Sequence, residues 1–179
     1  MIAAELVVGL KIPDVTALTA ANAIRRRLGY ADTLAEFRRA DYYCLDLDAD
    51  DEAAALDLVR DMAERTNLFV NPNKHSFTVR TLDERGGGGD GDGTHTINVL
   101  VTDPADASPA GILGSLQGMS AYGEVVQGVR RGVLWTMKLV ADSEQQAMKM
   151  AEDITVTRSQ SQGLLMNPHF QEYEMWAGG

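Results

Sequence analysis

An internal duplication is the feature that most constrains how this chain can fold. The segment Phe37 to Met62 aligns without a gap with Val129 to Ile154, and eight of the 26 aligned pairs are identical. Eight of the other 18 pairs are apolar in both segments, and unrelated segments of similar composition would not match in register in this way. The chain is therefore expected to contain two copies of one folding unit.

The duplication continues on both sides of this segment. Upstream, each copy starts with the alternating apolar residues of a half-buried strand, and the alignment pairs Leu6, Val8 and Leu10 with Ile97, Val99 and Val101. Downstream, each copy reaches an asparagine-proline turn, at Asn71-Pro72 and Asn167-Pro168, and then a short strand. Each copy therefore predicts the order strand, helix, strand, strand, helix, strand.

Apolar side chains at helical spacing predict two helices in each copy. The expected buried stripes are Ala17, Ala21, Ile24 and Leu28, then Ala55, Leu58, Val59 and Met62, and in the second copy Ile112, Leu113 and Leu116, then Ala147, Met150, Ala151 and Ile154. The second helices should begin at Asp50 or Asp51 and at Ser143, where Gln146 completes a capping box. This order of elements predicts an α+β fold of two tandem βαββαβ units, with antiparallel sheets and helices on one face.

A glycine-rich segment, Arg85 to Gly93, divides the chain nearly in half. Its glycines and aspartates have nothing apolar to bury, so we interpret it as a flexible linker. A strand follows it rather than a lysine and a helix, which disfavours a phosphate-binding loop, and a calcium loop would need further ligands. The predicted domains are residues 1–84 and 94–179, joined by 85–93, and the tether favours their packing as a pseudo-twofold intramolecular dimer.

The acidic composition excludes one class of partner. A formal net charge of −10 and a pI near 4.7 repel a phosphate backbone, so we expect no nucleic acid partner. No segment has the roughly 18 to 20 apolar residues of a membrane span, and the N-terminus lacks the pattern of a signal peptide, so we expect a cytoplasmic protein with no membrane contact. The single cysteine, Cys44, cannot form an internal disulfide.

Short motifs occur in a fixed order in the first copy. They are Leu10-Lys11, Pro13-Asp14, Leu28-Gly29-Tyr30, Phe37-Arg38, an acidic entry to the second helix, and Asn71-Pro72. Their order and spacing resemble the PurS family over Ala3 to about Glu84, and the likeness recurs from Thr96 to Trp176 with Asp103-Pro104, Val129-Arg130 and Asn167-Pro168. The chain departs from that family where a glycine-lysine pair usually follows the arginine, because Ala40-Asp41 and Gly132-Val133 stand there.

The resemblance implies a role in assembly. A PurS-like protein is the small subunit of phosphoribosylformylglycinamidine synthase, an amidotransferase that uses ATP and glutamine. The implied partners are a synthetase subunit (PurL-like) and a glutaminase subunit (PurQ-like), between which ammonia must pass. A tandem duplication would supply both halves of a PurS dimer from one chain, with further homodimerisation left open. Neither catalytic residues nor a cofactor are implied.

The residues themselves give catalysis little support. The histidines His75, His95 and His169 lack further metal ligands at fixed spacing, and no serine-histidine-acid pattern is present. Four aspartates are close in sequence: Asp46, Asp48, Asp50 and Asp51. We interpret the first two as the outer side of a strand and the last two as a helix start, where the helix dipole favours negative charge.

Two arginine pairs are the better functional candidates. Arg38-Arg39 and Arg130-Arg131 lie at equivalent places in an acidic chain and could bind a partner's carboxylates or a phosphate; solvated strand-end charges are the alternative. The predicted partner interface consists of Arg38, Arg39, Asn71, Pro72, Arg130, Arg131, Asn167 and Pro168. The competing hypothesis is a tandem ferredoxin-like regulatory domain that binds a small metabolite between its repeats.

Overall fold

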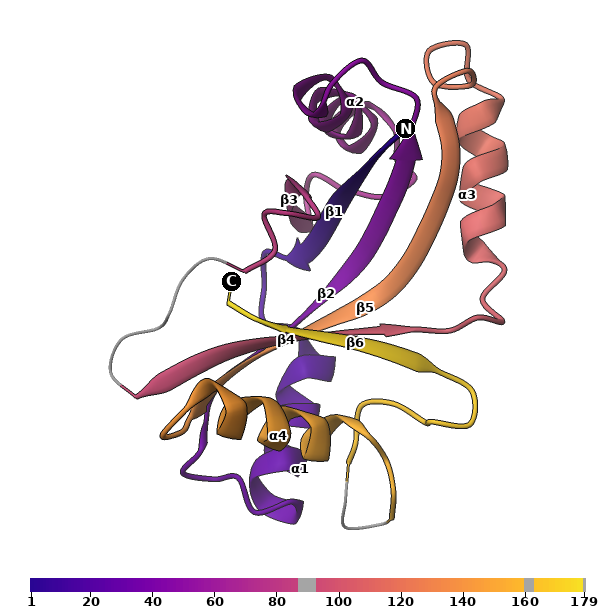
Figure 1. Cartoon of the computed structure of the whole chain (residues 1–179). Helices are drawn as coiled ribbons and strands as arrows, with labels where there is room; N and C mark the ends of the chain where they lie inside the picture. The colour runs from indigo at the N-terminus through magenta and orange to yellow at the C-terminus, as the bar shows by residue number, and fades with distance from the viewer. Residues whose placement is uncertain (87–92, 160–162, 179) are drawn as a thin grey trace. The chain divides into compact units, whose positions relative to one another are not determined.

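The computed structural model describes residues 1–86, 93–159 and 163–178, and these ranges contain six strands and four helices (Figure 1). The first repeat contains β1 (Ile2–Leu10), α1 (Val15–Arg27), β2 (Leu34–Leu47), α2 (Glu52–Arg65) and β3 (His75–Thr81). The second contains β4 (Thr94–Thr102), α3 (Ser108–Gln117), β5 (Val126–Val140), α4 (Glu144–Thr155) and β6 (Glu172–Ala177). None of these four helices is both long enough and apolar enough to cross a membrane.

The chain forms two compact units, each named here after its central strand. The β1 unit consists of Met1–Ile12, Ala40–Glu84 and Ala105–Gly132. The β4 unit consists of Pro13–Arg39, Arg85–Pro104 and Val133–Gly179. Each unit therefore contains segments from both repeats.

In the β1 unit the strand order is β3-β1-β2-β5. Strand β1 is antiparallel to β2 and β3, with Leu6 opposite Tyr43 on one side and Val79 on the other. Leu6 shares one buried cluster with Val59 of α2 and Leu116 of α3. Both helices therefore cover the same face of this sheet, as the α+β prediction requires.

The β4 unit has the corresponding order β2-β5-β4-β6. Strand β4 is antiparallel to β5 and β6, with Val99 opposite Trp135 and Met175. Its buried cluster joins Val99 to Ile24 of α1 and Ala151 of α4. Here too, both helices pack against one face of the sheet (Figure 1).

The first helix of each repeat belongs to the unit whose central strand comes from the other repeat. Helix α1 lies in the β4 unit and α3 lies in the β1 unit. Strand β2 passes from one unit to the other after Arg39, and β5 does so after Gly132. The two middle strands of the predicted βαββαβ pattern are thus the two halves of one long strand.

Matching hydrogen bonds join β2 and β5 in each unit. In the β1 unit the N–H of Asp48 donates to the carbonyl of Val125 over 2.8 Å. In the β4 unit the N–H of Val140 donates to the carbonyl of Thr33 over 2.9 Å. The two bonds join equivalent positions of the repeats, so the duplication extends to the backbone pairing.

The predicted domains, residues 1–84 and 94–179, are the two copies of the repeated sequence, and their limits stay a prediction. The compact units are defined differently, by which segments pack together. Most of the predicted linker, residues 87–92, lies outside the described residues. Arg85, at its start, forms an ion pair with Glu174 within the β4 unit, Nη1 to Oε1 2.7 Å.

One detail of the predicted alignment is wrong. Leu6 was expected to match Ile97, but Leu6 lies opposite Tyr43 whereas Val99 lies opposite Trp135, the residue equivalent to Tyr43. The first strands therefore correspond with a shift of two residues. A shift of two keeps every side chain on the same face of a strand, so the alternating pattern could not reveal it.

Side chains fix the starts of three helices. Asp14 caps α1, Asp51 caps α2 by accepting the N–H of Ala54 over 2.8 Å, and Ser143 caps α4 by accepting that of Gln146 over 3.2 Å. Gln146 accepts in return from the N–H of Asp142, one residue before the position that a capping box uses. After α1, Gly29 has φ 82°, the left-handed conformation that glycine commonly adopts after the end of a helix.

The helix exchange predicts which unit a core mutation weakens. Ile24→Ala, a change in the first repeat, should destabilise the β4 unit by about 3 kcal/mol, because Ile24 is fully buried there. Hydrogen exchange should show a larger loss of protection in β4 and α4 than in β1 and α2. Val59→Ala, the matched change in α2, should lower protection more in β1 and α2 than in β4 and α4. A loss of protection confined to β1 in the Ile24→Ala variant would contradict the placement of α1 in the β4 unit.

Candidate functional site

In the β4 unit, the second arginine of the first pair holds the start of α1. Arg39 forms an ion pair with Asp14, Nη1 to Oδ2 3.4 Å. The other oxygen of Asp14 accepts the backbone N–H groups of Thr16 over 2.8 Å and Ala17 over 3.1 Å. The carboxylate therefore joins β2 to the N-terminus of α1, where negative charge is favourable.

The β1 unit contains the same arrangement at α3. Arg131 forms an ion pair with Asp106, Nη1 to Oδ2 3.1 Å, and Asp106 Oδ1 accepts the N–H of Ser108 over 2.8 Å. Hydrogen bonds from the side chain and backbone of Ser108, with a further contribution from Arg131, hold the pKa of Asp106 below its ordinary value. In both copies the arginine follows its aspartate by 25 residues.

Arg39 and Arg131 therefore have a structural role in the chain itself. Their side chains are only 25% and 34% exposed. Tyr43 lies beside Arg131, and burial, with a further contribution from Asp41, raises the pKa of its hydroxyl although Arg131 opposes that rise. Contact of these two arginines with a partner stays a prediction.

The first arginines of the pairs are more exposed and differ between the copies. Arg38 is 75% exposed and pairs with Glu36 on its own strand, Nη2 to Oε2 2.7 Å. Arg130 is 59% exposed and reaches Asp46, Nη2 to Oδ1 3.0 Å, and the sulfur of Cys44 over 3.1 Å. An exposed guanidinium can exchange such a surface carboxylate for one on a partner, since surface ion pairs contribute little to stability.

The Arg130 site is shaped by a glycine. A Cβ atom on Gly128 would lie 2.8 Å from Asp46 Oδ2, so a larger residue there would require the Asp46 carboxylate to shift. In the other repeat the equivalent positions are Glu36 for Gly128 and Lys138 for Asp46, which reverses the charge of the second position. The two copies thus present different charge patterns at equivalent places.

The asparagine-proline turns, which hold the other four predicted interface residues, have one geometry in both copies. The side-chain oxygen of Asn71 accepts the N–H of Asn73 over 3.0 Å, and that of Asn167 accepts the N–H of His169 over the same distance. In the first copy, the carbonyl of Pro72 also accepts a hydrogen bond from Lys11 Nζ over 2.7 Å. Each turn leads directly into the last strand of its repeat.

The histidines of these turns occupy different positions. His75 Nδ1 accepts the N–H of Asn71 over 3.2 Å, and the equivalent acceptor in the second copy is Gln171 Oε1, which takes the N–H of Asn167 over 2.9 Å. His169 matches Asn73 instead. The occurrence of a histidine in both turns therefore does not reflect a duplicated site.

The aspartates near α2 are separated by their structural roles. Asp46 binds Arg130 and Asp51 caps α2, as described above, while Leu45 and Leu47 point into the core.

Within residues 1–86, 93–159 and 163–178, no group of three or more histidine, cysteine, aspartate or glutamate side chains could hold a metal ion. Burial, the largest influence, raises the pKa of the Cys44 thiol and so disfavours the reactive thiolate.

Sequence reasoning missed a buried charged group in β1. Glu5 is fully buried and accepts hydrogen bonds from the Tyr42 hydroxyl over 2.6 Å and from Arg80 Nε over 2.7 Å. The equivalent position in β4 is Asn98, which accepts from Thr136 Oγ1 over 2.8 Å. A polar residue inside an apolar strand in both copies was the available signal. These contacts provide donors for the buried oxygens of Glu5 and Asn98 and link neighbouring strands.

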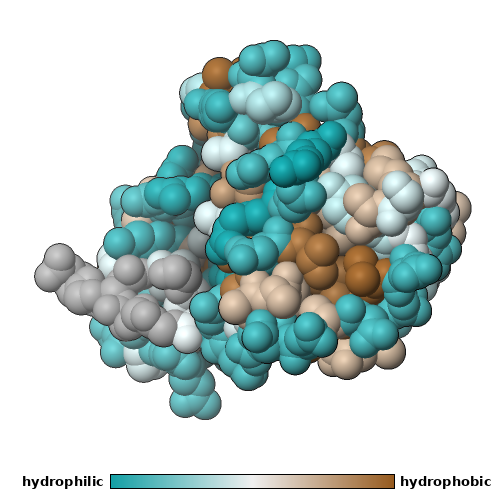
Figure 2. All heavy atoms as spheres, turned by 90° about the horizontal axis from the view of Figure 1, so that it is seen from above, coloured by the Kyte–Doolittle hydropathy of each residue, from teal (hydrophilic) through white to brown (hydrophobic). Residues whose placement is uncertain are grey.

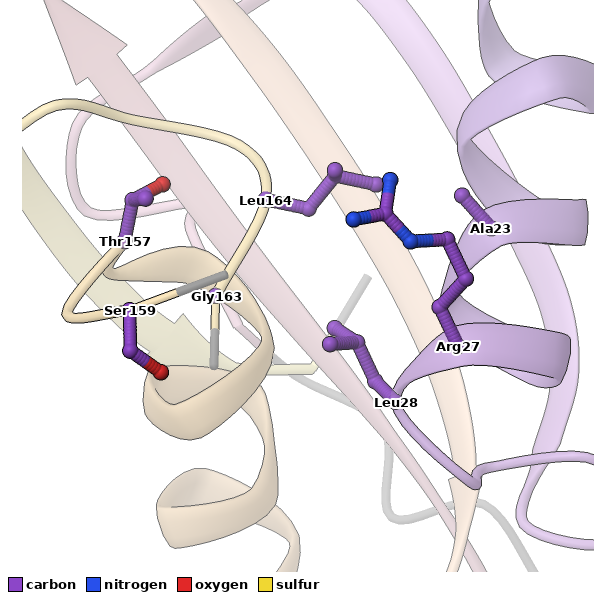
Figure 3. A pocket seen from close by; sticks show the side chains of 7 residues that line it. All are labelled: Ala23, Arg27, Leu28, Thr157, Ser159, Gly163 and Leu164. Carbon is purple, nitrogen blue, oxygen red and sulfur yellow. The ribbon is translucent and has the colours of Figure 1, made fainter. Parts of the chain in front are cut away.

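A small pocket lies in the β4 unit between the end of α1 and the segment after α4 (Figure 3). Its volume is about 220 Å³, and its lining includes Arg27, Thr157 and Ser159. Typical pockets for small molecules range from about 300 to 1,000 Å³. The pocket therefore offers limited room for the metabolite of the competing hypothesis.

Comparison with known proteins gives one family. Residues 3–83 match the family model PurS, described as phosphoribosylformylglycinamidine (FGAM) synthase. No curated protein and no solved structure matches the chain. The matched residues run from β1 through β3 and contain Asp14, Arg39 and the Asn71-Pro72 turn.

The turn geometry predicts which substitutions His75 tolerates. His75→Leu removes the acceptor for the N–H of Asn71 and should lower the free energy of unfolding by about 1 kcal/mol. His75→Gln should be nearly neutral, because Gln171 performs this task in the second copy. Urea unfolding of both variants measures the difference, and equal losses would contradict the assigned role.

The pKa of Asp106 predicts an acid dependence of stability. Because folding lowers this pKa, Asp106 stabilises the protein fully above its unfolded pKa, near 3.8, and this contribution is lost as the pH falls through the folded value. Asp106→Asn should therefore be less stable at pH 7 and should show a shallower loss of stability below about pH 4. Thermal unfolding between pH 3 and 7 tests this, and parallel curves for variant and wild type would refute it.

Proposed function

We infer from the match of residues 3–83 to the PurS model that the chain is a PurS-family protein of phosphoribosylformylglycinamidine synthase. On this premise we propose that it is a non-catalytic subunit that bridges the synthetase and glutaminase subunits in de novo purine biosynthesis. Ammonia released by the glutaminase must reach the synthetase without escaping to water. A bridging protein serves this purpose by fixing the relative positions of the other two subunits.

The duplicated geometry supports this proposal. The second repeat has the element order of the family-matched first repeat. It also repeats the aspartate-arginine contact with the same 25-residue separation. A chain with two PurS-like copies can supply two docking regions, one for each of the proposed partners.

The exposed first arginines are the best candidates for partner contact among the predicted interface residues. Arg38 and Arg130 lie in different units and each already binds a carboxylate. Guanidinium groups pair with carboxylates through planar, directional hydrogen bonds, so both can recognise an acidic partner surface. The asparagine-proline turns at Asn71-Pro72 and Asn167-Pro168 complete the proposed interface.

Reconstitution with separately purified synthetase and glutaminase subunits tests the function. The chain should bind both, and glutamine-dependent synthesis of FGAM should require it, whereas synthesis from added ammonium salts should not. Failure to bind either subunit, or glutamine-dependent synthesis at the same rate without the chain, would refute the proposal. Amino acids and nucleotides that raise the melting temperature of the isolated chain would instead favour the regulatory hypothesis.

Substitution of the first arginines tests the proposed contacts. Arg38→Ala combined with Arg130→Ala should weaken partner binding about tenfold, a loss expected when interface arginines are removed, and should leave the melting temperature nearly unchanged. Arg60→Ala, which removes an arginine of a surface ion pair on α2, is the control. Unchanged affinity of the double variant in calorimetric titrations would exclude these arginines from the interface.

A further inference from the structure

The first helices of both repeats lack charge where surface helices normally carry it. No charged residue occurs in Val15–Ile24 of α1 or in Ala107–Gly123, which contains α3. The second helices differ, since α2 contains four acidic residues and two arginines, and α4 contains three acidic residues and one lysine. A helix face that is neither charged nor buried within its own chain is a candidate for contact with another molecule.

Helix α1 exposes large apolar side chains on this face. Its inner face buries Ala17, Ala21 and Ile24. On the other side Val15 is 73% exposed and Leu18 is 53% exposed. Hydrophilic residues predominate on the face that Figure 2 shows, although apolar side chains gather near its centre. Single exposed apolar groups are normal for a folded protein. Two large apolar residues one turn apart, with no charged residue between them and Arg25, are a more specific signal.

The other end of α1 is basic. Arg25, Arg26 and Arg27 form its last turn, and α1 contains no acidic residue. Arg25 donates to the carbonyls of Leu34 and Ala35 and so fixes the helix end, while Arg26 is exposed. The chain as a whole has a net charge of −10. Helix α1 is therefore a place where an acidic surface can approach this acidic protein with attraction rather than repulsion.

Helix α3 provides an internal comparison. Its exposed residues are small and uncharged, and a Cβ atom on Gly111 or Gly114 would meet nothing within 4 Å. Its last turn has no basic residue. The helices that start the two repeats have therefore diverged, and only α1 combines protruding apolar groups with positive charge.

We propose that the outward face of α1, defined by Val15, Leu18 and Arg26, docks an apolar protein surface bordered by carboxylates on a subunit of the synthase. This inference rests on the proposed function and specifies one contact region for it. Val15 and Leu18 insert into the apolar part of the partner surface, and Arg26 meets the carboxylates. Because α3 has a different face, the two repeats dock different surfaces.

Two variants and two controls test the proposal by calorimetric titration against each purified subunit. Val15→Ser combined with Leu18→Ser should raise the Kd for one subunit at least about tenfold. Arg26→Glu should raise the Kd for the same subunit and reduce the dependence of binding on salt concentration. Leu82→Ser and Arg60→Glu change exposed residues of the β1 unit and should leave both Kd values unchanged.

The outcomes separate this inference from the proposed function. If the wild-type chain binds neither subunit, the proposed function fails and the docking contact fails with it. If the wild type binds and the α1 variants bind equally well, the docking face is wrong although the function stands. Light scattering, which measures the oligomeric state, tests whether a second copy of the chain occupies this face. If the wild type forms oligomers that the serine substitutions dissociate, and partner binding is unchanged, the face belongs to a second copy and the proposal is overturned.

Discussion

The exchange of first helices between the two cores is the constraint on which the rest of this structure depends. Helix α1 supplies Ile24 to the core of the β4 unit, and α3 supplies Leu116 to that of the β1 unit. In neither unit do helices of one repeat alone cover the sheet. Each repeat therefore needs the other to bury its apolar face, which gives a physical reason why two copies in one chain form a stable protein.

The aspartate-arginine contacts follow from this exchange. Strand β2 passes from one unit to the other after Arg39, and β5 does so after Gly132, the residue that follows Arg131. At these points each arginine binds the aspartate at the start of the first helix of its own repeat. One local interaction thus fixes the helix start relative to the strand that follows it. Its repetition is a conserved part of the duplicated geometry, whereas the Arg38 and Arg130 surroundings have diverged.

Several elements could be predicted because they depend on local patterns. Alternation identified the strands, the 3.6-residue period identified the helices, and Asp51 and Ser143 were expected at the starts of the second helices. Asp106 was missed because the alignment emphasised Asp103-Pro104, although Asp106 has the same separation from Arg131 that Asp14 has from Arg39. Glu5 was missed because a single carboxylate in a strand gives no sign of partners distant in sequence, such as Arg80.

By itself the sequence determined the duplication, the order of elements and the likeness to a family, because composition and period are properties of neighbouring residues. Only the tertiary structure decided which core each first helix enters, that the middle strands are continuous, and that the first strands correspond with a shift of two residues. The apolar face of a helix shows that the helix must pack against other apolar residues. It does not show which ones, because the two similar repeats offer two similar apolar surfaces. The choice between them depends on the path of the chain through β2 and β5, which no local pattern records.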